Sequence, residues 1–283
     1  MEQQKSLESL SSDVIAANVE MYREVARNYD HCFQRAFGEV VYTTLERDLD
    51  VIASRFASEE GPIDCLDCGA GTGALTLGML ARGWRVTAVD VSPDMLKLLE
   101  KKIASQNLHA TLVNEPIENF LAHAAATYHL IGFNSVLHHI YDYRSVVSLA
   151  VDRLKPGGIL YSNVDPVSPS HPLASEIFDS VDTLLAKLMN ERVDLIPGTV
   201  RRLRKLFAAT DRTFGRKVLT AGDIAEFHAR SGIDDLGLMR LLQARGMVIL
   251  EHSRYPMSRV PLTEPFNKFF KLRMEFKFIA ERS

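Results

Sequence analysis

The sequence predicts an α/β fold in which a mostly parallel sheet is covered by helices on both faces. Two observations carry this prediction. Between residues 63 and 165, apolar segments of strand length alternate with helical segments, and the first strand ends in a run of glycines. Strands separated by helices of this length are joined by right-handed crossovers. Because ligands of such sheets bind beyond the carboxyl ends of the strands, we expect the functional site there.

Each predicted element of this region has its own local signal. The helix over 73–83 stops at Gly83, and the helix over 92–107 has Ser92 as its N-cap with Pro93 in the first turn. The helix over 143–154 ends at the turn "KPGG". A further helix is predicted at 117–126. The strands are predicted at 63–69, 85–92, 109–115, from 128 onward and at 158–165.

Helical patterns surround this region. Apolar residues recur three and four positions apart over 12–56, and 165–235 looks like a mainly helical insertion. A helix and a strand follow in 236–256, and the last strand is predicted from Met274 to Ala280. One face of a helix in the insertion holds Ile177, Val181, Leu184, Leu185, Leu188 and Met189. We expect one domain with four parts: cap helices 1–60, a cofactor-binding core 61–165, a helical lid insertion 166–235, and a C-terminal helix and strands 236–283.

Composition limits the class of protein. The 283 residues are 46% hydrophobic, so a large core is available, and the net charge of −3 argues against a dedicated nucleic-acid binder. The polar N-terminus lacks a signal-peptide pattern, and no apolar run approaches the ~18 residues that span a bilayer. Three cysteines are too few for a disulfide framework. We therefore expect a cytoplasmic protein without membrane partners.

Three motifs overlap in the stretch "IDCLDCGAGTGALTLGML", residues 63–80. Cys65 and Cys68 form a C-x-x-C. A redox dithiol usually lies at a helix N-terminus, and a zinc site needs further ligands, whereas these cysteines lie in or just after a strand and only Cys32 remains. Packing in the core is the favoured interpretation of the pair.

The second motif is the dinucleotide pattern G-x-G-x-x-G/A. Gly69, Gly71 and Ala74 fit it, and Asp90 follows Gly69 by 21 residues, close to the ~20 expected for a ribose-binding acid. Two features count against NAD. The carboxylate of Asp67 lies two residues before the first glycine, where it does not favour binding of a negatively charged diphosphate. Gly73 is one glycine more than the pyrophosphate-binding turn requires.

The third motif, D-x-G-x-G-x-G, suits a cationic nucleoside. S-adenosylmethionine carries an ammonium and a sulfonium and has no phosphate. Asp67 can hold the ammonium directly or through water, and Asp90 can accept both ribose hydroxyls. Glycine backbone lets the amino-acid part of the ligand lie close to the chain.

The same stretch resembles a family. "LDCGAGTGALTLGMLARGWRVTAVDVSPDML" is similar to the first two motifs of class I S-adenosylmethionine-dependent methyltransferases, and "YHLIGFNSVLHHI", "LKPGGILYSN" and "FKFIAER" extend the likeness in order. It covers roughly residues 22–164 and the last fifty, and is strongest to small-molecule enzymes of the ubiquinone- and biotin-pathway type. The resemblance implies a Rossmann-like sheet of seven mostly parallel strands with an antiparallel last strand. From the helical segments described above, we also expect helices on both faces, a helical N-terminal cap and a helical lid insertion.

The resemblance also implies cofactor contacts. Asn134 and Ser135 would lie below the sulfonium. Met95 matches a position that packs on adenine or simply in the core, and Tyr29 matches a tyrosine that closes over the cofactor or is buried in the cap. After the third strand, many relatives have an Asp followed by an Ala, which bind adenine. This chain has "VNEPIENF" at that place. Either Glu115 takes the place of the Asp, or the backbone at Ile117 alone holds adenine. The remaining matches are Asp67, Gly69, Ala70, Gly71 and Gly73 in the methionine-binding loop, Asp90 for ribose, and Val91 beside adenine.

The candidate catalytic residues are His138 and His139. A neutral imidazole at the mouth of the site can deprotonate a phenol, an enol or an acid, while the alternative is that the pair caps and packs its loop. Adjacent histidines without an acid make a weak metal site, so no metal is predicted. Because the sulfonium is a good leaving group, holding the nucleophile close and aligned supplies most of the catalysis.

The favoured function is methylation of oxygen or carbon of a small, partly apolar molecule, with S-adenosylmethionine as cofactor. One alternative is an RNA or protein methyltransferase that uses the basic stretch 201–217, "RRLRKLFAATDRTFGRK"; the other interpretation of that stretch is the solvated face of a helix. Further alternatives are an NAD(P)-dependent oxidoreductase and a cofactor-binding partner subunit without activity. The acidic chain argues against nucleic acid as a partner, and a homodimer stays open.

Overall fold

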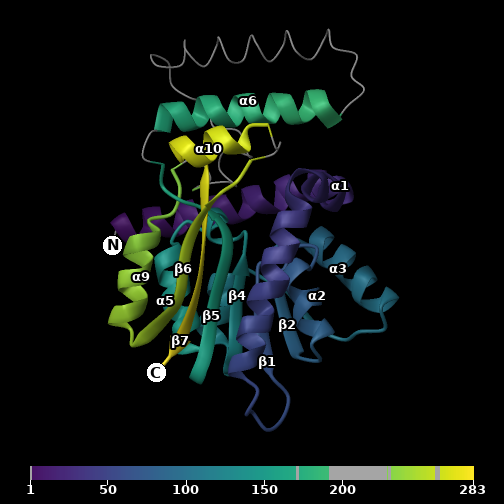
Figure 1. The fold of residues 1–283 in the computed structure, drawn as a ribbon. Coiled ribbons are helices and arrows are strands. Elements are labelled where there is room, and N and C mark those ends of the chain that lie inside the picture. Colours follow the sequence, from purple (N-terminus) through teal and green to yellow (C-terminus); the bar gives the residue numbers. More distant parts are fainter. Residues whose placement is uncertain (1, 170–171, 191–227, 229–230, 259–261) are drawn as a thin grey trace.

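A computed structural model describes residues 2–169, 172–190, 228, 231–258 and 262–283. Seven strands form one sheet in the order β3-β2-β1-β4-β5-β7-β6 (Figure 1). Strands β1 to β5 pair in parallel, and β7 runs antiparallel to both β5 and β6. This confirms the predicted fold class. The strands are β1 Asp64–Cys68, β2 Arg85–Asp90, β3 Thr111–Asn114, β4 Tyr128–Asn134, β5 Leu154–Pro166, β6 Met247–Pro256 and β7 Met274–Arg282.

Helices cover both faces of the sheet, and each face has its own hydrophobic core. On one face, α4 Ile117–His123, α5 Tyr143–Asp152 and α9 Asp235–Ala244 pack together. On the other, α2 Ala74–Ala81 and α3 Pro93–Ser105 pack beside α1, Glu2–Arg55 (Figure 1). The predicted cap of α3 is present, because the Ser92 hydroxyl accepts a hydrogen bond from the Met95 N–H at 3.4 Å.

The two cysteines of the C-x-x-C pattern lie in these two cores. Cys65 packs with the core beneath α1, α2 and α3, and Cys68 packs with the core beneath α4 and α5. Neighbouring positions of a strand point to opposite faces, so residues three apart cannot share one face. Burial raises the pKa of both thiols well above its usual value. The interpretation of the pair as core residues is confirmed.

Helix α1, Glu2–Arg55, has two arms. Its first arm crosses beyond the carboxyl ends of the parallel strands, and its second arm runs along one face of the sheet (Figure 1). The second arm is held by apolar contacts of Leu45, Leu49 and Ile52, which are fully buried. The prediction of helix over 12–56 is therefore correct in kind, and the helix extends further toward the N-terminus.

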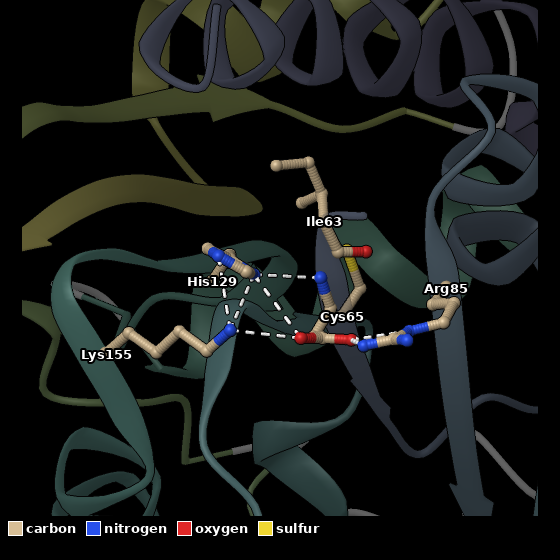
Figure 2. Close-up of polar contacts among 6 residues, drawn as sticks. Ile63, Cys65, Arg85, His129 and Lys155 are labelled. Carbon is tan, nitrogen blue, oxygen red and sulfur yellow. Dashed lines mark hydrogen bonds and ion pairs between the residues drawn. The ribbon is translucent and has the colours of Figure 1, made fainter. Parts of the chain in front are cut away.

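At the opposite end of the sheet from the glycine run, polar contacts of Asp64 join four strands; Figure 2 labels its partners Arg85, His129 and Lys155. Its carboxylate accepts hydrogen bonds from Arg85 Nε at 2.7 Å and Lys155 Nζ at 3.0 Å, and its N–H donates to His129 Nδ1 at 2.8 Å. Burial raises the pKa of Asp64, but the hydrogen bonds from Arg85 and Lys155 outweigh this effect and lower it. This cluster fixes the amino ends of β1, β2, β4 and β5.

The predicted insertion is described only in part. Its amphipathic helix is present as α6, Pro172–Asn190, but Ile177 and Val181 on the expected apolar face are 54% and 46% exposed. Phe178 and Asp182 are buried instead, because α6 packs against α10, Glu264–Phe270, through the stacked rings of Phe178 and Phe266. The side chains of Leu188 and Met189 and the basic stretch 201–217 lie outside the described residues.

Within the part of the chain that the structure describes, no helix is both long and apolar enough to cross a bilayer.

Candidate functional site

A cavity of about 950 Å³, counted with its open mouth, lies at the carboxyl ends of β1, β2 and β4. The loop between β1 and α2 lines the cavity, and further lining comes from α1 and from the turn after β4. This is the place where open α/β sheets bind their ligands. The lining residues are Ile15, Asn18, Tyr22, Tyr42, Gly69, Ala70, Gly71, Thr72, Gly73, Ala74, Asp90, Val91, Met95, Pro116, Ile117, Glu118, Asn134, Ser135, Val136, His139 and Ile140.

The glycine loop needs its glycines for two physical reasons. Gly69, Gly71 and Gly73 all have positive φ, at 75°, 52° and 96°. A Cβ on Gly69 would lie 2.6 Å from Val136, and one on Gly73 would lie 2.2 Å from Leu99. At Gly71 a Cβ would meet no protein atom within 4 Å, so it would project into open space at the cavity wall. The loop therefore offers bare backbone to a ligand.

Asp90, at the end of β2, organises this loop. Its carboxylate oxygens accept hydrogen bonds from the Gly71 N–H and the Ser92 N–H, each at 2.7 Å. Burial raises the pKa of Asp90, while these two backbone hydrogen bonds lower it in part. Each carboxylate oxygen retains a second lone pair, and Asp90 lines the cavity. The residue can accept ligand hydroxyls while it holds the loop in place.

Asp67, the first residue of the D-x-G-x-G-x-G motif, lies beneath the loop and is not one of the lining residues. The Thr76 hydroxyl donates a hydrogen bond to its Oδ2 at 2.6 Å. Burial raises the pKa of Asp67 to about 7, and the negative charge of Asp90 adds to this effect. A cation bound near these two carboxylates would offset both the cost of burying the Asp67 charge and its repulsion by Asp90. The electrostatics of this wall therefore favour a positively charged ligand.

The expected adenine side of the cavity is apolar. Val91, Met95 and Ile117 line it, as does the carboxylate residue Glu118 in the first turn of α4. Glu115 is not a lining residue; its carboxylate lies 3.6 Å from His123 Nε2. The acid that reaches the cavity after β3 is therefore Glu118. Burial raises its pKa.

The end of β4 contributes Asn134 and Ser135 to the cavity floor. Ser135 adopts a left-handed conformation with φ of 62°, and its N–H donates to the Asn163 carbonyl at 2.8 Å. Asn134 Oδ1 is buried and has no hydrogen-bond partner among the described residues. Buried polar atoms normally have a partner, so this oxygen is a candidate acceptor for a ligand N–H.

The two histidines after β4 have different environments. His138 is buried outside the cavity lining, and its Nδ1 lies 2.8 Å from Asp165 Oδ1. Burial lowers the pKa of His138 to about 3, so its imidazole is neutral. Asp165 also accepts hydrogen bonds from the His138 N–H at 3.2 Å and the Ser162 hydroxyl at 3.1 Å. It follows a register shift in β5, where Val164 has a φ of 61°.

His139, by contrast, lines the cavity. Its Nε2 lies 2.8 Å from the hydroxyl of Tyr22 on α1. The two rings meet edge to face with centroids 5.6 Å apart. The structure thus separates the histidine pair into one buried residue bonded to Asp165 and one cavity residue paired with Tyr22.

Sequence reasoning missed the cavity residues of α1. Ile15, Asn18 and Tyr22 are spaced by three and four, so they share one helix face. That spacing was the only local signal, and it does not distinguish a cavity wall from an ordinary packed face. Tyr42 also lines the cavity, while the side chain of Tyr29, the predicted cofactor-covering residue, lies outside the described residues.

Comparisons with known proteins agree with this geometry. Residues 66–160 match the family model of a methyltransferase domain. A ubiquinone biosynthesis O-methyltransferase of Xylella fastidiosa (strain 9a5c) is 28% identical over 149 residues, which are 52% of this chain and 60% of that protein. The chain therefore matches less than two thirds of this curated relative's length.

Two solved structures share the fold. The plantazolicin methyltransferase BpumL, solved with a monoazolic desmethylPZN analog and S-adenosylhomocysteine, has a TM-score of 0.55 at 13% identity and full coverage of both chains. An S-adenosylmethionine-dependent methyltransferase from Clostridium acetobutylicum ATCC 824 has a TM-score of 0.54 at 14% identity, with 91% of this chain and 98% of that chain covered. At these identities the likeness concerns the fold.

The seven-stranded sheet, the glycine loop after β1 and the acid that ends β2 define a nucleoside-binding α/β protein. The family match covers the elements that carry the loop and the acid. Residues 66–160 are thus identified as a methyltransferase domain, and the comparisons support a class I S-adenosylmethionine-dependent methyltransferase with S-adenosylmethionine as its cofactor. This sets aside the NAD(P) interpretation of the glycine motif.

Proposed function

We propose that the protein transfers the methyl group of S-adenosylmethionine to an oxygen or carbon atom of a small, partly apolar molecule. The observation that carries the proposal is that His139 and Tyr22 face the same cavity as the glycine loop and Asp90. The cavity also has apolar lining from Ile15 and Ile140. The name of the curated relative, an O-methyltransferase of ubiquinone biosynthesis, supports oxygen as the acceptor atom.

The cavity fits the cofactor on three counts. The backbone of Gly71 is open to the cavity, Asn134 Oδ1 is an orphaned acceptor, and two buried carboxylates lie at the same wall. When bound, the cofactor supplies a methyl group on a sulfonium, which is a good leaving group. We propose that Asp90 holds the ribose hydroxyls and that the carboxylate of Asp67, buried beneath the glycine loop, stabilises the ammonium by its negative charge. The further proposed contacts are Gly69, Ala70, Gly71, Gly73, Val91, Met95, Ile117, Asn134, Ser135 and, among the acids after β3, Glu118 rather than Glu115.

His139 is the proposed general base. A neutral imidazole can take the proton from an acceptor hydroxyl or an acidic C–H as the methyl group is transferred. The hydrogen bond between His139 and Tyr22 fixes the ring against α1. His138 is proposed as a positioning residue, because its pairing with Asp165 anchors the turn that carries His139.

The cofactor assignment is tested by calorimetry on the wild type and Asp90→Ala, with NADH as control. We expect S-adenosylmethionine and S-adenosylhomocysteine to bind the wild type with micromolar affinity and the variant at least tenfold more weakly. Exclusive binding of NADH would contradict the cofactor assignment.

The acceptor class is tested with methyl-labelled cofactor and a panel of small phenols, enols and carboxylic acids, at low and high salt. A small-molecule reaction barely depends on salt, whereas an RNA methyltransferase loses binding steeply as salt rises. For the best acceptor, His139→Gln is expected to lower kcat about 10²-fold or more while S-adenosylhomocysteine affinity stays unchanged. Unchanged kcat in this variant would remove His139 from the base role.

A further inference from the structure

Asn18, on the first arm of α1, carries a buried oxygen atom with no partner among the described residues. The residue is 6% exposed and lines the cavity. Its Nδ2 donates to the Val14 carbonyl at 2.9 Å and to the His139 carbonyl at 3.3 Å. The unpartnered atom is its Oδ1.

The orientation of this amide is fixed by its surroundings. Exchanging the amide oxygen and nitrogen would place Oδ1 against two carbonyl oxygens, those of Val14 and His139, and would lose both hydrogen bonds. Leaving a buried acceptor unsatisfied is costly, because the atom has lost its hydrogen bonds to water and gained none in return. A residue held in this orientation at a cavity wall is therefore suited to accept a hydrogen bond from a ligand.

We propose that Asn18 recognises the methyl acceptor by accepting a hydrogen bond from one of its O–H or N–H groups. The inference rests on the proposed function. It assigns the acceptor a class: a small molecule with a hydrogen-bond donor beside an apolar surface. Ile15, one helical turn before Asn18, and Ile140, next to His139, supply apolar lining for that surface.

The contacts of Asn18 indicate that the hydrogen-bond donor to its Oδ1 belongs to the methyl-accepting substrate and not to the cofactor. Asn18 is bonded to Val14 and His139, which lie on α1 and in the turn after β4. Among the described residues, no hydrogen bond of the Asn18 side chain reaches the glycine loop or Asp90, whose own contacts are with Gly71 and Ser92. Asn18 thus binds the backbone carbonyl of His139, the proposed base. Tyr22, one turn further along α1, binds the His139 side chain. A donor on Asn18 Oδ1 would place the acceptor molecule beside His139.

The test uses the full chain saturated with S-adenosylhomocysteine and two fluorescent probes of nearly equal shape. 2-Naphthol has a hydroxyl donor, and 2-methoxynaphthalene has none. The affinity of each probe is measured by fluorescence titration, and the affinity for S-adenosylhomocysteine is measured by calorimetry. The variants are Asn18→Leu and Asn18→Ala, with Asn119→Leu, an exposed asparagine of helix α4, as the matched control.

We expect the wild type and Asn119→Leu to bind 2-naphthol on the order of tenfold more tightly than its methyl ether. This preference should disappear in both Asn18 variants, while their affinity for S-adenosylhomocysteine stays within about twofold of the wild type. Asn18→Ala serves if Asn18→Leu does not fold, as judged by its thermal transition.

Three results would overturn the proposal. The first is a wild-type complex that does not distinguish the probes, and the second is a preference that persists in the Asn18 variants. The third is a loss of S-adenosylhomocysteine affinity with the probe preference intact, which would make the cofactor the donor. A wild type that binds no S-adenosylhomocysteine would instead contradict the proposed function, so the two failures are distinguishable.

Discussion

Lys277 on β7 and Asp48 on α1 form an ion pair whose two side chains are almost fully buried, at 3% and 1% exposed. The Tyr161 hydroxyl donates to the other oxygen of Asp48 at 3.2 Å, and Glu251 lies 2.9 Å from the Lys277 ammonium. These contacts join the second arm of α1 to β5, β6 and β7. They therefore fix the helix whose first arm forms the cavity wall.

Breaking this ion pair from one side should be strongly destabilising. Lys277→Ala leaves the buried carboxylate of Asp48 with only the exposed Arg47, 3.7 Å away, as a cation, and we expect it to lower the free energy of unfolding by about 3–5 kcal/mol. The double variant Asp48→Leu with Lys277→Met should recover most of that loss. Urea unfolding of the single and double variants measures both effects. A loss below about 1 kcal/mol for Lys277→Ala would show that the pair does not hold α1.

Asp67→Asn should make the cofactor-free protein more stable at pH 8 and leave stability at pH 4 unchanged. The folded pKa of Asp67 is raised from 3.8 to about 7. Its contribution to stability is therefore fully present below about pH 4 and is lost as pH rises through 7. The loss is about 1.4 kcal/mol for each pH unit that separates the folded pKa from the unfolded pKa. An asparagine oxygen can still accept the hydrogen bond from Thr76.

The same variant should bind S-adenosylmethionine more weakly than the wild type, because it lacks the negative charge that favours a cation. Thermal unfolding of the cofactor-free proteins from pH 4 to 8 and calorimetry of the cofactor measure the two effects. Equal stability of both proteins at pH 8 would contradict the burial of an ionised Asp67.

Gly71→Ala and Gly73→Ala should separate cofactor binding from folding. At Gly71 the added methyl meets no protein atom, so the cost in stability is that of a left-handed alanine, about 1 kcal/mol. At Gly73 the methyl would lie 2.2 Å from the buried Leu99, and the φ of 96° adds strain, so we expect a loss of about 3 kcal/mol.

Only Gly71→Ala should fold nearly normally and still lose at least tenfold in cofactor affinity, because its methyl occupies the cavity wall. Urea unfolding and calorimetry give the two readouts. Normal cofactor affinity in Gly71→Ala would show that the ligand does not lie against this part of the loop.

Substitutions of Ser135 should follow its backbone conformation. With φ at 62°, glycine is tolerated, whereas a β-branched side chain is strained. We expect Ser135→Val to have a free energy of unfolding about 1–2 kcal/mol below that of Ser135→Gly. Denaturant unfolding of the two variants checks the order. The reverse order would mean that side-chain burial outweighs the strain at this turn.

The sheet and the glycine loop could be predicted because their signals are local. Strand and helix periods, the Ser92 cap and the spacing from Gly69 to Asp90 all lie within short stretches of sequence. The roles of the two histidines could not be separated in this way. His138 is buried because Asp165, 27 residues later, turns toward it at the register shift in β5.

The α1 wall of the cavity was missed for the same reason. The contacts of Asn18 and Tyr22 with His139 join residues 121 and 117 positions apart. Neither the sequence around Asn18 nor the sequence around His139 contains a local signal that predicts this contact. The distinction between Glu115 and Glu118 depends on where α4 begins, at Ile117. That boundary places Glu118 in the first turn, at the cavity, and leaves Glu115 beside His123.

The division of the cavity between two stretches of the chain has a consequence for redesign. In the described residues, α1 contributes Ile15, Asn18, Tyr22 and Tyr42 to the lining, whereas the glycine loop and Asp90 belong to β1, β2 and the segments that follow them. Since the second arm of α1 is anchored by Asp48, the first arm can be varied without touching that anchor. A small combinatorial library at positions 15, 18 and 22 therefore changes the shape of the α1 side of the cavity while the glycine loop and Asp90 stay constant.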